Sequence, residues 1–168
     1  MGDNARHKLL ADLIRLRFPD RAMHVVDVAA GRGQLKRALE RAGYRHVTCW
    51  DRRHKQARPR PGQYWQEFHW RLAPDDYDLV AAMHPDEATD HAILYAARVR
   101  VPFLVCPCCI KPSGSEFMAN CFDRAAWFRH LTRLARERDM RVIETRLPMN
   151  GANVVFIGYP KESRRWEN

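Results

Sequence analysis

The chain has 168 residues, of which 46% are hydrophobic and 29% are charged. This length and composition are typical of a single globular domain that buries its own core. No apolar run approaches the roughly 18–20 residues of a membrane span, which excludes a transmembrane protein. The charged N-terminal segment also lacks the apolar stretch of a secretory signal.

The pattern of apolar residues predicts alternating helices and strands. The first helix follows from the spacing of Leu9, Leu10, Leu13 and Ile14, and the strands follow from short β-branched runs. In chain order we expect a helix at 5–18, a strand at 24–29, a helix at 33–42, a strand at 46–50, a weaker strand at 63–68, a strand at 77–83, a helix at 87–99, a strand at 101–106, a helix at 120–139, and strands at 141–146 and 153–159.

This alternation predicts an α/β protein with a seven-stranded, mostly parallel sheet and helices on both faces. The last two strands are separated only by the turn-rich segment at 148–151, so they pair antiparallel and one strand runs against the rest. We expect one domain over residues 1–168, with an N-terminal helix within 1–20 and a basic tail at 160–168.

A glycine-containing turn follows the first predicted strand and indicates a nucleotide-binding site. Gly31 and Gly33 stand between this strand and the next helix, and Asp51 ends the following strand, where a carboxylate binds ribose hydroxyls. A dinucleotide-binding site requires a third glycine at the position where this chain has Lys36, which argues against that class of site. Asp27 would repel a pyrophosphate and suits a cationic ligand. A simple helix-entry turn with loop carboxylates is the alternative.

These motifs resemble the class I S-adenosylmethionine-dependent methyltransferases, over roughly residues 20–160. The resemblance implies a Rossmann-like methyltransferase fold and S-adenosylmethionine as the cofactor. It places Gly31 and Gly33 under the methionine part, Asp27 near the amino group or in contact with it through water, and Asp51 on the ribose. The other cofactor-binding residues that we expect are Ala29, Arg52, Glu67, Phe68 and Met83. Ala29 replaces the first loop glycine of the family, and Arg52 replaces an apolar residue that packs on adenine.

Candidate acceptor-side residues follow the fourth strand. His84 can accept a proton near neutral pH, and Asp86 stands beside it. Alternatively, His84 is only a helix-entry residue and Asp86 caps the helix that starts at Glu87. Enzymes that methylate the exocyclic amines of bases have an aromatic residue in this segment. The present chain lacks it, which argues against methylation of that type.

Cysteines crowd after the fifth strand. Cys106, Cys108 and Cys109 admit three interpretations, of which core packing comes first. The second interpretation is a metal site that also uses Cys121. Because adjacent ligands strain a tetrahedral site, we expect no metal. The third is a catalytic Cys108 that adds to a pyrimidine ring. The odd number of crowded cysteines indicates a reducing cytoplasm rather than a disulfide framework.

The net charge of +9 favours RNA as the acceptor. Basic residues cluster at 52–60, along the helix at 120–139 and at 164–166, although a solvated arginine-rich surface would look the same. A His followed by a Cys-Cys pair also looks like the subgroup that includes eukaryotic tRNA 2′-O-methyltransferases. We therefore expect a methyltransferase acting on tRNA or rRNA, with a homodimer or a partner protein as an aid to substrate recognition. The alternatives are a small-molecule methyltransferase and a non-catalytic RNA-binding or partner-activating module.

Overall fold

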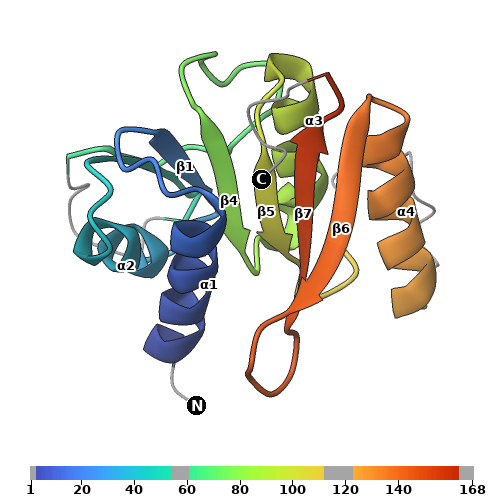
Figure 1. Ribbon diagram of the computed structural model, residues 1–168, viewed down its shortest axis with the longest axis horizontal. Helices are drawn as coiled ribbons and strands as arrows, with labels where there is room; N and C mark the ends of the chain where they lie inside the picture. The colour runs from blue at the N-terminus through green and yellow to red at the C-terminus, as the bar shows by residue number, and fades with distance from the viewer. Residues whose placement is uncertain (1–2, 54–60, 112–122, 163–168) are drawn as a thin grey trace.

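The computed structural model describes residues 3–53, 61–111 and 123–162 (Figure 1). Its helices are α1 (Asp3–Arg17), α2 (Gln34–Arg41), the short 3₁₀ helix η1 (Asp86–Ala88), α3 (Thr89–Val99) and α4 (Arg124–Arg136). Its strands are β1 (His24–Val28), β2 (His46–Trp50), β3 (Gln63–Tyr64), β4 (Leu79–Met83), β5 (Phe103–Cys106), β6 (Met140–Arg146) and β7 (Val154–Pro160).

The seven strands form one sheet in the order β3-β2-β1-β4-β5-β7-β6. All neighbouring pairs are parallel except those of β7, which runs antiparallel to both β5 and β6. The prediction of a mostly parallel sheet with one reversed strand is therefore confirmed. The strand order reverses between β1 and β4, and ligands of open α/β sheets bind beyond the carboxyl ends of the strands at such a point.

Helices cover both faces of the sheet, so the central strands are buried on both sides (Figure 1). One apolar cluster packs α1 and α2 against residues such as Val25, Leu79 and Ile157. The other packs α3 and α4 against the alternate residues, including Val26, Val80 and Phe156. Burial on both faces explains why these strands read as continuous apolar runs.

Two predicted elements differ from the structure. The strand expected at 63–68 is limited to Gln63–Tyr64, because Phe68 leaves the sheet and packs edge-on against Trp50 and Tyr95, with ring centroids 5.9 and 5.3 Å apart. The helix expected from residue 87 begins at Thr89, after η1.

The long helix near the C-terminus begins at Arg124 in the described part of the chain. Its N-cap is Asp123, whose side chain accepts hydrogen bonds from the backbone N–H groups of Ala125 and Ala126. The predicted start at residue 120, Cys121 and the end of the tail at 163–168 lie outside the described residues. In the described segments, no helix combines the length and apolar character that a bilayer crossing requires.

Candidate functional site

The turn between β1 and α2 uses left-handed backbone at three positions. Ala29, Gly31 and Gly33 have φ of 55°, 57° and 68°. A Cβ atom on Gly33 would lie 2.7 Å from Nε2 of Gln63, but this flexible side-chain end can shift, so glycine is favoured there mainly by its positive φ. Ala29 thus adopts a conformation that favours glycine although it carries a side chain. The turn brings free N–H groups of the α2 N-terminus to the sheet edge.

Asp51 joins this turn to the end of β2. Its Oδ2 accepts a 2.7 Å hydrogen bond from the backbone N–H of Gly31, and its Oδ1 accepts one of the same length from the N–H of Arg53. The Arg53 guanidinium also donates to both carboxylate oxygens, at 3.3 and 3.4 Å. Burial alone would raise the pKa of Asp51, but these hydrogen bonds lower it below its ordinary value. Asp51 is therefore a stable anion at the cleft.

Asp27 lies behind the turn rather than in the cleft. It is 1% exposed, and Cys49 donates a 3.7 Å hydrogen bond to its carboxylate. Burial raises the pKa of Asp27 to about 7, against the opposing effect of a backbone hydrogen bond from Lys36 in the first turn of α2. In this structure Asp27 ties β1 to the start of α2.

A cleft opens beyond the carboxyl ends of β1, β2 and β4. Its lining residues are Ala29, Trp50, Asp51, Arg52, Arg53, Glu67, Phe68, Pro85, Asp86, Glu87 and Ala88. Aromatic rings and small apolar side chains thus alternate with carboxylates, and the free volume is only about 30 Å³.

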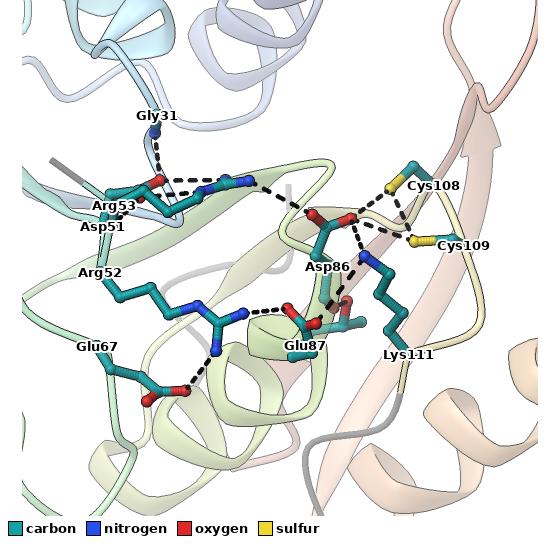
Figure 2. Close-up of polar contacts among 11 residues, drawn as sticks. Gly31, Asp51, Arg52, Arg53, Glu67, Asp86, Glu87, Cys108, Cys109 and Lys111 are labelled. Atoms are coloured by element: carbon teal, nitrogen blue, oxygen red, sulfur yellow. Dashed lines mark hydrogen bonds and ion pairs between the residues drawn. The ribbon is translucent and has the colours of Figure 1, made fainter. Parts of the chain in front are cut away.

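Two arginines span this cleft (Figure 2). Arg52 lies between Glu67, at 3.9 Å, and Glu87, at 3.2 Å. Arg53 extends from Asp51 toward Asp86, whose Oδ2 is 3.8 Å from Nη1. The cleft is narrow because these side chains lie across it.

His84 is held by segments far from it in the sequence. Nδ1 accepts a 2.9 Å hydrogen bond from Arg6 of α1, and Nε2 donates a 3.0 Å bond to the carbonyl of Ala152. Burial lowers the pKa of His84, although the bond to Ala152 opposes this effect. His84 does not line the cleft; it connects the loop after β4 to α1 and to the turn between β6 and β7.

Asp86 does not cap a helix, contrary to one of our sequence interpretations. The residue begins η1 with a φ of 51°, and its side chain turns toward the loop after β5 (Figure 2). Its Oδ1 accepts hydrogen bonds of 3.2 Å from both Cys108 and Cys109. Burial favours a raised pKa for Asp86, but these thiols and the nearby Lys111 lower it.

The cysteines differ in exposure and environment. Cys106, the last residue of β5, is fully buried in the hydrophobic core, and this burial raises its pKa to about 12. Cys108 and Cys109 are half-buried, and burial together with the neighbouring thiol and carboxylate raises the pKa of Cys109 to about 12. The pKa of Cys108 is raised as well, mainly by burial, which disfavours the thiolate that a nucleophile needs.

The structure brings together part of the predicted site. Ala29, Asp51, Arg52, Glu67, Phe68 and Asp86 all line the cleft. Gly31 and Gly33 form the adjoining turn, whereas Asp27 and Met83 are buried in the core beside it. We did not single out Arg53 or Glu87. The signal for Arg53 is its position two residues after the expected ribose carboxylate, within the basic cluster at 52–60.

A cationic groove lies between α1 and α2, on the face that covers β1. Its cations are Lys8, Arg15, Arg37 and Arg41, and its single acid is Asp12. Asp12 pairs with Lys8 at 2.7 Å, which leaves an excess of positive charge along the groove. Arg37 lies next to Gly33, so the groove approaches the turn that borders the cleft.

Comparison with solved structures identifies proteins of the same fold. No protein-family model matches the sequence, and neither does any curated protein. The fold matches Streptomyces venezuelae DesVI with a TM-score of 0.65 at 14% identity, covering 94% of this chain and 91% of the other.

Two further matches have the same character. The ribosomal protein L11 methylase of Lactobacillus delbrueckii subsp. bulgaricus gives a TM-score of 0.61 at 13% identity, covering 91% of this chain and 78% of the other. The 1,6-didemethyltoxoflavin-N1-methyltransferase of Burkholderia thailandensis, solved with S-adenosylhomocysteine, gives 0.59 at 16%, covering 93% and 78%. The chain has the Rossmann-like fold of the class I S-adenosylmethionine-dependent methyltransferases.

Proposed function

We propose that this protein is an S-adenosylmethionine-dependent methyltransferase. The observation that carries the proposal is the position of Asp51, an anion at the carboxyl end of β2 that lines the cleft and holds the Gly31 turn. A carboxylate at this point suits the hydroxyls of a ribose. Structural neighbours solved with S-adenosylmethionine or S-adenosylhomocysteine support the same cofactor for this fold.

The chemistry of the lining fits this cofactor. Trp50 and Phe68 contribute apolar ring atoms to the lining, and Asp51 and Glu67 offer acceptors for hydroxyl or amino groups. When bound, S-adenosylmethionine supplies a methyl group activated by its sulfonium centre. The task of this chain is then to align donor and acceptor, because holding two reactants in the right geometry removes most of the entropic cost of their reaction.

Arg52 and Arg53 must leave the cleft for a nucleoside to enter. Their side chains are 53% and 45% exposed, and ion pairs at such exposure contribute at most about 1 kcal/mol. Ribose hydroxyls would compete with Arg53 for Asp51. We therefore propose that cofactor binding displaces the two arginines.

On the acceptor side, we propose that the loops after β4 and β5 receive the substrate. Asp86 borders the cleft and stands next to Cys108, while His84 acts as a positioning residue that holds the loop in place through Arg6 and Ala152. A catalytic role for His84 or Cys108 remains a prediction.

For the acceptor itself we propose RNA, either tRNA or rRNA. The cationic groove and the net charge of +9 support a polyanionic substrate, since such surfaces bind phosphates without regard to sequence. A small molecule is the second candidate, favoured by neighbours such as the sugar N-methyltransferase KedS8.

Calorimetric titration with S-adenosylmethionine and S-adenosylhomocysteine tests the cofactor assignment. We expect micromolar binding by the unsubstituted chain. Asp51→Asn, which removes one charged acceptor, should lower the affinity for the cofactor by at least about tenfold. Arg53→Ala, which removes a side chain from the cleft, should raise this affinity by up to about fivefold. Arg45→Ala, which changes an exposed arginine away from the cleft, is the control. An absence of binding by the unsubstituted chain would refute the methyltransferase proposal.

Transfer of a tritiated methyl group tests the acceptor. The chain is incubated with labelled S-adenosylmethionine and either total cellular RNA or a metabolite extract. Label in RNA that ribonuclease releases supports the first acceptor. Label confined to the metabolite extract supports the second and excludes RNA as the main substrate.

A further inference from the structure

Two thiols and one carboxylate oxygen converge at the acceptor edge of the cleft. Cys108 Sγ and Cys109 Sγ each lie 3.2 Å from Asp86 Oδ1 and 3.3 Å from each other (Figure 2). Within the described ranges, this is the set of cysteine, histidine and acidic side chains whose donor atoms are close enough to share one ion. The set joins a loop after β4 to a loop after β5.

We propose that Asp86, Cys108 and Cys109 bind one thiophilic divalent metal ion of the Zn²⁺ class. Zinc binds thiolate sulfur at about 2.3 Å and carboxylate oxygen at about 2.0–2.2 Å. The three donor atoms form a nearly equilateral triangle, and a point about 2.2–2.3 Å from all three lies about 1.2–1.3 Å above its plane. Soft thiolate donors select zinc over magnesium or calcium.

The tertiary structure answers the objection that adjacent cysteines make poor ligands. In an extended strand, successive side chains point to opposite faces. Strand β5 ends at Cys106, and the chain turns after it so that both sulfurs reach the same carboxylate oxygen. A regular tetrahedral site needs ligand separations of about 3.5–3.8 Å, so the triangle must widen by about half an ångström.

The surrounding charges suit a site with three anionic ligands. Two thiolates and a carboxylate exceed the charge of a divalent ion by one. Lys111 Nζ lies 3.7 Å from Asp86 Oδ1, and Arg53 Nη1 lies 3.8 Å from Oδ2, so cations already compensate this excess. Both side chains are partly exposed and can move as the ion enters.

The protein provides three ligands and leaves a fourth position for water or another group. Sites with three protein ligands and one open position are typical of catalytic rather than structural zinc. Because Asp86 also lines the cleft, the open position is available to a molecule bound there. This metal site goes beyond the proposed methyl transfer and does not depend on it.

Cobalt substitution tests the site independently of activity. The full chain, stripped with a chelator under reducing conditions, is titrated with Co²⁺ and followed by absorbance. We expect one equivalent to bind, with near-ultraviolet sulfur-to-cobalt charge-transfer absorption and visible bands of a distorted tetrahedral ion. One equivalent of Zn²⁺ should displace the cobalt and abolish both signals.

Substitutions assign the ligands. Cys108→Ser and Cys109→Ser should each halve the charge-transfer absorption and weaken Zn²⁺ binding by at least about tenfold. Asp86→Asn should weaken binding but keep the sulfur bands. Cys106→Ser, a buried cysteine on the adjoining strand, should bind cobalt like the unsubstituted chain.

Three outcomes would overturn the proposal. The first is the absence of sulfur-to-cobalt absorption in the reduced chain. The second is full binding by the variant that carries both Cys108→Ser and Cys109→Ser. The third is an equal loss of cobalt binding in Cys106→Ser, which would show that the ion binds at a different site. Circular dichroism of each variant separates a lost ligand from a lost fold.

Discussion

Ala29, His84 and Asp86 hold the left-handed backbone conformation although they carry side chains. Their φ angles are 55°, 55° and 51°, and all three follow the central strands β1 and β4. Each such residue costs about 1–2 kcal/mol relative to an ordinary conformation. Strain of this kind persists where surrounding contacts fix the backbone, and it concentrates at functional sites. The hydrogen bonds of His84 and Asp86 provide such contacts here.

Asp27 makes the stability of the protein depend on pH. Its pKa is about 7 when folded and near 3.8 when unfolded, so the folded state binds more protons between these values. Stability contributed by the protonated group is therefore lost as pH rises through this window. In the unsubstituted chain we expect Asp27 to lower the free energy of unfolding by about 2–3 kcal/mol between pH 5 and pH 8. This decline should be absent from Asp27→Asn. Urea denaturation at both pH values measures it, and an equal decline in both proteins would contradict the assignment.

At the level of elements, β7 determines how closely the C-terminal half of the sheet packs. This strand lies between β5 and β6 and is buried along its whole length. Gly158 pairs with Phe103 of β5, and the aromatic ring lies over the glycine. A Cβ atom at Gly158 would lie 2.0 Å from the ring of Phe103, so the glycine is needed for space.

We expect Gly158→Ala to destabilise the protein by about 1–3 kcal/mol, because a methyl group must displace a fully buried ring. Chemical denaturation measures the change. The loss should be smaller in a Phe103→Leu background, which removes the clashing atoms. Equal losses in the two backgrounds would show that the contact does not limit packing.

At the scale of the whole molecule, the two helical layers differ in what they present to solvent. The layer of α1 and α2 carries the cationic groove that approaches the Gly33 turn. The layer of α3 and α4 carries a separate basic surface, to which Arg129, Arg133 and Arg136 contribute. Only the first surface adjoins the turn that borders the cleft, so we expect it to guide an RNA substrate.

Retention of total tRNA in a native gel measures this preference. We expect the affinity for tRNA to fall steeply as the salt concentration rises. The double variant Arg37→Ala, Arg41→Ala should bind tRNA more weakly. Its plot of log affinity against log salt concentration should be shallower by about two, one for each lost phosphate contact. The matched control is Arg129→Ala, Arg133→Ala on the other layer. A larger effect from the control pair would assign RNA to the opposite face, and affinity independent of salt would exclude phosphate contacts.

The sequence by itself determined the α/β class, the reversed strand and the glycine turn with its carboxylate. These features depend on residues close together in the chain, such as the run from Val25 to Gly33, or on patterns of burial that every strand repeats. Phe68 shows the limit of such patterns. Its neighbours in sequence predict a strand, but its side chain leaves the sheet and packs in the hydrophobic core.

Only the tertiary structure decided the contacts between loops. Arg53 reaches Asp86, Arg6 reaches His84, and Cys108 reaches Asp86 across 33, 78 and 22 residues of chain. The first and third pairs meet because the order of strands in the sheet brings the ends of β2, β4 and β5 to one edge, and the second meets because α1 packs against β4. Strand order depends on packing over the whole domain, which no local pattern encodes.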